Sequence, residues 1–227
     1  MPKFDIAGRG RMWFIISLIV IVPGLISMVT RGFNFGIDFT GGTIIDLKFE
    51  QPVGIAAVLV FMLLFYRLPG FIADISLMAY TLMLLGTLKG LDATLTLPGV
   101  AGIILSIGMA VDANVLIFEH FKEEFRMGKS IRLAMDAGFK RAFTTIFDSN
   151  ITTIIAAGVL FLFGTGTIRG FAITLGLGVL LSMLTAVSLT QFMLKLLVNA
   201  KIVESPSAYG ADSFVLFDPA ADGKAVK

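Results

Sequence analysis

The stretch LPGVAGIILSIGMAVDANVLIFEH, from Leu97 to His120, decides how the rest of the chain is interpreted. Between Val100 and Phe118 only Asp112 and Asn114 are neither apolar nor small, and an apolar run of this length predicts a transmembrane helix. A carboxylate at the centre of such a helix costs roughly 2.5 to 3.5 kcal/mol on insertion, so it normally faces a protein interior or a water-filled path. Asp112 therefore predicts an ion or proton route, and we expect the rest of the chain to supply its partner.

The composition predicts an integral membrane protein with several spans, because 56% of the 227 residues are hydrophobic and only 15% are charged. The chain has no cysteine and a single histidine, which excludes disulfides, Cys-ligated metals and His-rich metal clusters. The sequence shows no nucleotide-binding motif or nucleophile constellation. We therefore expect no enzymatic activity, no metal and no cofactor, with protons as the coupling ion.

The first span is predicted from Trp13 to Val29 and belongs to residues 1–30, the cytoplasmic N-terminus with its helix. A cleaved signal peptide is the alternative, but the apolar run is longer than a signal core and favours a retained helix. Residues 31–52 are expected to lie outside the membrane as an extracytoplasmic remnant. Within it, the alternation from Ile44 to Glu50 predicts a short β-strand.

Five more spans are predicted in residues 53–198, which gives an all-α bundle of six transmembrane helices. The second span is short, about 21 Å as a helix against a hydrocarbon core of about 30 Å. It either thins the bilayer or marks a junction between two pieces of a longer protein near Gln51. The five spans are Val53–Tyr66, Phe71–Leu88, the central Val100–Phe118, Phe143–Phe163 and Gly170–Val198.

The distribution of basic residues predicts the orientation. Six spans with the N-terminus inside place every Lys and Arg on the cytoplasmic side except Arg31, Lys48, Lys89 and Arg169. Both termini are therefore expected in the cytoplasm. Residues 199–227 mix Ser, Pro, Gly, Ala and Asp, and this tail is predicted to be cytoplasmic and disordered.

A charged segment, residues 119–141, joins the central span to the next one. We interpret it as a helical extension, a turn at Gly128, and an amphipathic helix from Ser130 that lies on the cytoplasmic face of the membrane lipid. Its lysines and arginines are offset by acidic residues and lack an aromatic stacking platform, which argues against binding to nucleic acid.

The fifth span supplies a candidate partner for Asp112. Counted from the cytoplasmic ends of two antiparallel helices, Asp112 and Asp148 both lie roughly 10 to 13 Å deep, so they are expected to meet at one level. Two carboxylates in a low-dielectric site should not both ionise, so one of them would hold a proton. Four polar residues are expected either to hydrogen-bond these carboxyl groups or simply to hold helices together: Asn114, Asn150, Thr152 and Thr153. Arg141 is either a helix-end anchor or a counter-ion.

Several motifs resemble one known family in their order along the chain. Leu95–Gly99, Gly108–Glu119, Gly138–Phe143, Asp148–Thr153 and Phe163–Ala172 resemble the membrane region of SecD, and the likeness covers residues 53–198. Residues 1–52, with Gly36–Thr43, resemble the start of SecF, the sister subunit. The chain is therefore identified as a member of the SecD/SecF protein-export family, within the RND superfamily, and it looks composite.

The resemblance implies the function that we expect. SecD and SecF are accessory subunits of the Sec translocase in the bacterial inner membrane, and they use the proton-motive force to help export unfolded polypeptide beside the SecYEG channel. It also implies that Asp112 couples protons, that a SecF-like subunit is a partner, and that the fold is one RND-like half of a pseudo-symmetric membrane unit.

This sequence departs from the family in three places. The large extracytoplasmic domain that handles the exported chain is missing, because only Gly32–Gln51 stands between the first two spans. His120 stands where the family would have Arg, and Thr167 where it would have Pro. Two alternatives therefore stay open, a non-coupling scaffold that binds the translocon and an RND-like exporter of small molecules.

Overall fold

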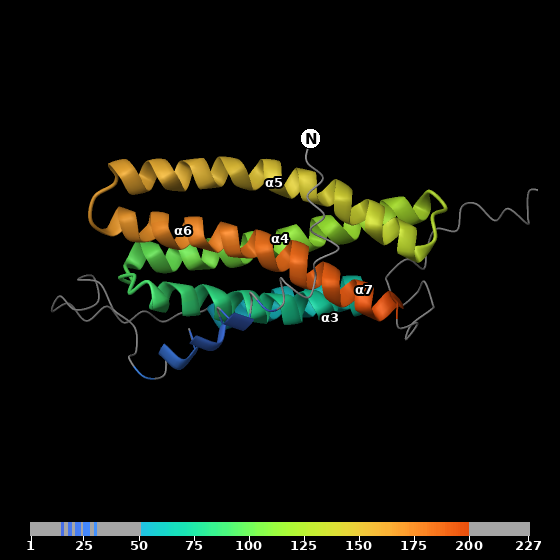
Figure 1. Ribbon diagram of the computed structural model, residues 1–227, viewed down its shortest axis with the longest axis horizontal. Coiled ribbons are helices and arrows are strands. Elements are labelled where there is room, and N and C mark those ends of the chain that lie inside the picture. The colour runs from blue at the N-terminus through green and yellow to red at the C-terminus, as the bar shows by residue number, and fades with distance from the viewer. Residues whose placement is uncertain are drawn as a thin grey trace, which may run out of the picture.

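The computed structural model describes residues 51–199, together with residues 15, 18, 19, 21–23, 25–27 and 30, which are helical. Figure 1 shows three long helices running side by side along the long axis, α4, α5 and α6. The strand predicted at Ile44–Glu50 and residues 200–227 of the predicted tail lie outside the described residues, within which no strand is formed. The helices are α3 (Gln51–Gly90), α4 (Leu97–Arg126), α5 (Ile131–Phe163), α6 (Thr167–Leu184), the π-helix η2 (Thr185–Thr190) and α7 (Gln191–Asn199).

Four helical stretches in the described part are long and apolar enough to cross a membrane, so the chain is a multi-pass membrane protein. They are Ile55–Gly90, Leu97–Arg126, Ile131–Phe163 and Thr167–Val198, and the last combines α6, η2 and α7. The six-helix count is not confirmed. The predicted first span lies only partly within the described residues, and the predicted second and third spans are joined in α3.

α3 folds back on itself at a single residue. Arg67 has φ 49° and ψ −116°, which no α-helical residue adopts, and Pro69 follows it. A methyl group added to Gly70 would meet the backbone carbonyl of Met62, so the chain reverses tightly here and requires glycine. Ile55 and Leu77 line the same pocket, whereas in a straight helix they would lie about 33 Å apart. The break predicted after Tyr66 is therefore present. It involves only Arg67, the one residue of α3 whose φ and ψ are not helical, so the helical segments before and after it belong to the same element.

Small residues bring α4 and α6 into close contact. A methyl group on Gly102 would meet the hydroxyl of Thr174, and one on Gly178 would meet the side chain of Ser106. Gly170 in turn lies against Thr96, the N-cap of α4, whose hydroxyl accepts from the Gly99 N–H. Interdigitation of glycines with small hydroxyl side chains lets helix backbones approach in a membrane, so this interface is closed.

α4 and α5 meet at the opposite end from the α3–α4 connection, through a turn in which Gly128 has φ 84°. This confirms the predicted turn. The separate amphipathic helix predicted from Ser130 is not found, because α5 continues without a break from Ile131 to Phe163. Phe121, Phe139 and Leu194 form part of a buried apolar cluster there, so the charged segment is packed against α4 and α7 rather than laid along a lipid surface.

Candidate functional site

Asp112 lies near the midpoint of α4 and is exposed on the surface of the bundle. The sequence predicts a carboxylate that faces either the protein interior or a water-filled path, and the described residues do not bury it. Asp112 makes no hydrogen bond or ion pair with any other residue of the described part. It does border two hollows, one on each side of α4.

The first hollow lies between α4 and α5 and has a volume of about 250 Å³. Asn150 is buried beside it, and the Asn150 side chain forms no hydrogen bond within the described residues. A space of this size with several polar groups can hold ordered water. We call it the α4–α5 pocket, and its lining is Met109, Asp112, Ala113 and Leu116 from α4 with Ile146, Ser149, Asn150 and Thr153 from α5.

The second hollow, of about 360 Å³, lies between α4 and the folded-back α3 and is lined almost entirely by aliphatic side chains. Asp112 is the only charged residue that lines this second hollow. Gly108, one turn before Asp112, also lines it and has no side chain. The two hollows differ in kind. Of the two hollows, only the α4–α5 pocket is lined by other side chains that can form hydrogen bonds, namely Ser149, Asn150 and Thr153.

The predicted pair of Asp112 with Asp148 is not formed. Asp148 is exposed and is absent from the lining of the α4–α5 pocket, although its neighbours Ser149 and Asn150 belong to it. Residues two apart on an α-helix point about 200° away from each other, so Asp148 and Asn150 cannot share one face. Thr152 is also exposed outside the pocket, whereas Thr153 lines it.

Asn114 has a buried role away from Asp112. The Thr190 hydroxyl lies 3.0 Å from the Asn114 Oδ1 and 3.0 Å from the Ser76 Oγ, and all three side chains are buried. The three groups join α4, η2 and α3 in the core. Because a single hydroxyl donates only once, Thr190 donates to one neighbour and accepts from the other. We call these residues the core hydroxyl network, and they show that Asn114 holds helices together, one of the two roles that the sequence allows.

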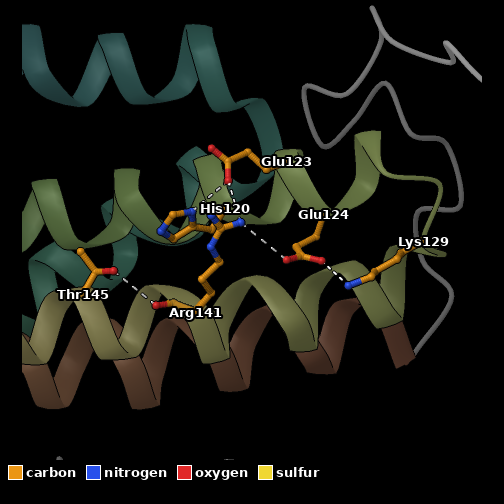
Figure 2. A network of polar contacts seen from close by, with 6 residues as sticks. All are labelled: His120, Glu123, Glu124, Lys129, Arg141 and Thr145. Carbon is orange, nitrogen blue, oxygen red and sulfur yellow. Dashed lines mark hydrogen bonds and ion pairs between the residues drawn. The ribbon is translucent and has the colours of Figure 1, made fainter.

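Arg141 belongs to a charged cluster at the α4–α5 end of the bundle, which Figure 2 shows. Its Nη1 lies 3.2 Å from Glu123 Oε2 and 3.9 Å from Glu124 Oε1. The Nδ1 of His120 lies 3.3 Å from the same oxygen of Glu123, and Lys129 pairs with Glu124. Arg141 lies inside α5 rather than at its end, and it pairs with the last turns of α4 instead of with Asp112.

A second ion cluster at this end ties the α3 reversal to α4. Tyr66 donates a 2.9 Å hydrogen bond to Glu119, whose same oxygen lies 3.1 Å from the Lys122 ammonium. That ammonium also lies 4.2 Å from the centre of the Tyr66 ring, a cation–π contact. The level of the α3 turn is thereby fixed to the end of the apolar part of α4.

Three residues at or near the site were missed by sequence reasoning. Ser149 lines the pocket, and Ser76 and Thr190 complete the core hydroxyl network. The only signal for Thr190 is the cluster of hydroxyl residues from Thr185 to Thr190 within an apolar span. That cluster forms a π-helix, and π-helical turns occur frequently at functional sites.

A multi-pass helical bundle in which a mid-helix carboxylate has no partner among the described residues defines an integral membrane protein with a polar site inside its spanning region. Residues 42–200 match the family model described as the protein export membrane protein SecD/SecF, C-terminal, and residues 26–53 match the SecD/SecF GG motif. The chain belongs to the SecD/SecF family.

Similar proteins support this assignment. The chain is 61% identical over 172 residues to protein translocase subunit SecD of Acidaminococcus fermentans, covering 76% of this chain and 41% of that protein. It is 51% identical over 168 residues to protein translocase subunit SecDF of Bacillus subtilis, covering 74% of this chain and 23% of that protein. The crystal structure of SecDF from Thermus thermophilus, a translocon-associated membrane protein, is similar with a TM-score of 0.65 and 39% identity, over 67% of this chain and 21% of that one.

The chain thus spans less than half the length of each of these relatives. The matched part is the membrane region that contains α3 to α7. What the longer proteins do as a whole is therefore carried to this chain only as a proposal.

Proposed function

We propose that this chain is a membrane subunit of a Sec-type protein translocase, in which Asp112 carries protons whose flow assists polypeptide export. The proposal accords with the names of its relatives, which are translocase subunits. It needs no cofactor besides the proton. SecYEG and an exported unfolded polypeptide are the partners that the proposal implies.

The observation that carries the proposal is the position of Asp112. α4 has 30 residues and Asp112 lies near its middle, about 20 Å from either end. An exposed carboxylate at that depth would face hydrocarbon, which is costly, unless a protein partner or water covers it. A protonated carboxyl costs far less than a carboxylate in such a place, so protonation and the covering of Asp112 are coupled.

The exposed face of α4 fits a partner helix. Ala101, Leu105, Gly108 and Asp112 follow one another at intervals of four, three and four residues and are all exposed. A methyl group on Gly108 would meet nothing within 4 Å, so a second helix can approach closely one turn before the carboxylate. We assign this face to a SecF-like subunit that would complete the membrane unit.

The charges suggest which end is cytoplasmic. The end with the α4–α5 turn holds Arg126, Lys129, Arg132, Lys140 and Arg141, while Lys89 and Arg169 mark the other end. Under the positive-inside rule the former is cytoplasmic, in a bacterial inner membrane. With the predicted first span inserted in the membrane, we then expect both chain termini on the cytoplasmic side.

Proton flux into proteoliposomes tests the proposal, with this chain reconstituted beside a SecF-type partner. We expect Asp112→Asn to lower flux by at least about a hundredfold, since the amide keeps the size of the side chain but cannot exchange the proton. Asp112→Glu should restore part of the flux. Asp148→Asn is the matched control, because it removes a carboxylate of the same membrane region that lies outside the α4–α5 pocket.

Two results would contradict the proposal. Equal flux through the unmodified chain and Asp112→Asn would leave a scaffold that binds the translocon without coupling. Asp112-dependent flux that rises on addition of a small hydrophobic cation, with no effect of either variant on export of a secreted reporter, would instead favour an RND-like exporter.

A further inference from the structure

The face of α4 that lines the α4–α5 pocket continues to the charged cluster at the end of the helix. Met109, Asp112, Leu116, His120 and Glu123 follow at intervals of three, four, four and three residues, which keeps them on one side of a helix. Contacts at both ends agree with this, since Asp112 and Leu116 line the pocket against α5 and Glu123 pairs with Arg141 of α5. The single histidine of the chain thus lies between the pocket and the outer end of the α4–α5 interface.

His120 is placed where it can exchange protons with water. Its side chain is 14% exposed, and its Nδ1 lies 3.3 Å from Glu123 Oε2. Figure 2 shows the imidazole and the Arg141 guanidinium meeting at this one carboxylate. Glu124 on α4 is already paired with Lys129 and Arg141, so Glu123 and Arg141 are the charged groups that face the imidazole from α4 and α5. Imidazole is the side chain that gains and loses a proton near neutral pH.

One apolar layer separates the imidazole from the pocket. Asp112 and His120 are eight residues apart, about 12 Å along the helix axis, and Leu116 lies four residues from each. Leu116 and Ile146 line the pocket on the side toward His120. Leu116 and Ile146 are therefore the side chains that have to move for water in the pocket to reach His120.

We infer that His120 is the proton acceptor through which a proton leaves Asp112 toward the end of the bundle that carries the α4–α5 turn. The protonated Asp112 gives its proton to water in the pocket, and the neutral imidazole takes up a proton from that water. The imidazolium, held beside Glu123, then releases it to bulk water. Asp112 is left as a carboxylate and His120 as neutral imidazole, so one proton has moved and no other bond has changed.

This inference rests on the proposed function and is specific to this chain. In the SecD family that this chain resembles, we expect Arg at the position of His120. A guanidinium stays charged at all physiological pH values, so it cannot relay a proton. If protons pass through the imidazole, flux should depend on the pH of the compartment that His120 faces.

The test compares His120→Gln, His120→Arg and the unmodified chain in the proton-flux assay, with internal pH varied between about 6 and 8. We expect both variants to lower flux about tenfold and to remove its dependence on internal pH. His120→Arg is the decisive variant, because it preserves the contact with Glu123 while removing the titration. Lys140→Gln is the control, since it removes an exposed charge on α5 near the same end.

Full flux with an ordinary pH profile in His120→Arg would overturn the inference and leave the proposed function intact. Absence of Asp112-dependent flux in the unmodified chain would overturn both. A second measurement does not depend on the variants. Because the chain has one histidine, a ¹⁵N-imidazole spectrum of the unmodified protein reports His120 alone. A ring that fails to change protonation between about pH 5 and 8 would also overturn the inference.

Discussion

α4 makes two interfaces that differ in almost every respect. Against α6 it is closed, with Gly102 facing Thr174 and Gly178 facing Ser106. Against α5 it opens in the middle into a polar pocket of about 250 Å³ that contains Asp112. The side of α4 that faces α6 is therefore tightly packed, whereas the side that faces α5 leaves room for water.

The difference indicates how a membrane helix can hold a costly carboxylate. The α4–α6 contact and the core hydroxyl network fix the rotation and depth of α4. With that side rigid, the α4–α5 side can stay loosely packed and polar without loss of the fold. Three substitutions test this division of roles, each measured as the free energy of unfolding of the purified protein in mixed detergent.

The largest effect is expected from Gly178→Val. The added side chain would collide with Ser106 and approach the Tyr80 hydroxyl, so α4 and α6 must separate. Overpacking of this kind costs about 3 kcal/mol. Gly108→Val is the matched control on the exposed face of α4, where a new Cβ meets nothing within 4 Å. Similar losses for the two variants would show that the α4–α6 contact is not the rigid side.

An intermediate effect is expected from Thr190→Val. The exchange keeps the shape of the side chain and removes the hydroxyl that joins Asn114 to Ser76, both of which stay buried. Leaving buried polar groups without their partner costs about 2 kcal/mol. Thr190→Ser restores the hydroxyl and should recover most of that loss. A stable Thr190→Val protein would mean that the network contributes little to the packing of η2.

The smallest effect is expected from Thr153→Val, the same exchange on the open side. Thr153 lines the pocket, where water can take over any hydrogen bond that is lost, so the free energy of unfolding should change by less than about 0.5 kcal/mol. Proton flux should nevertheless fall, because a methyl group replaces a polar group beside Asp112. A loss of stability as large as that of Thr190→Val would remove the distinction between the two interfaces.

Sequence reasoning predicted the parts of the fold that depend on composition and spacing. The apolar runs ending at Phe163 and Val198 and the turn at Gly128 are present. Each follows from a local property, such as the length of an apolar run or the positive φ of a glycine. The predicted break between Tyr66 and Phe71 contains the reversal at Arg67. The prediction makes this break longer than it is, because a single non-helical residue is enough to turn the chain.

The candidate site was predicted only in part. The prediction compared how deep the Asp112 and Asp148 side chains lie in the membrane, but not the direction in which each points from its helix axis. Asp112 and Asp148 lie at similar depths, but Asp148 points about 200° away from Asn150 and stays outside the pocket. A helical wheel shows that Asp148 and Asn150 cannot both serve the site. The core hydroxyl network could not be predicted from the sequence. It joins residues 76, 114 and 190, and their relative positions depend on how three helices pack.

The π-helix η2 sets the rotation of α7 relative to α6. A π-helical turn is closed by i→i+5 hydrogen bonds and so contains one residue more than an α-helical turn. The extra residue rotates everything after it by about 100°. Lys195 meets Asp136 of α5 at 2.8 Å, beyond η2, whereas α6 meets α4 before it. Deletion of one residue between Thr185 and Thr190 would therefore turn Lys195 away from Asp136, whereas an exchange of one apolar residue for another there would not.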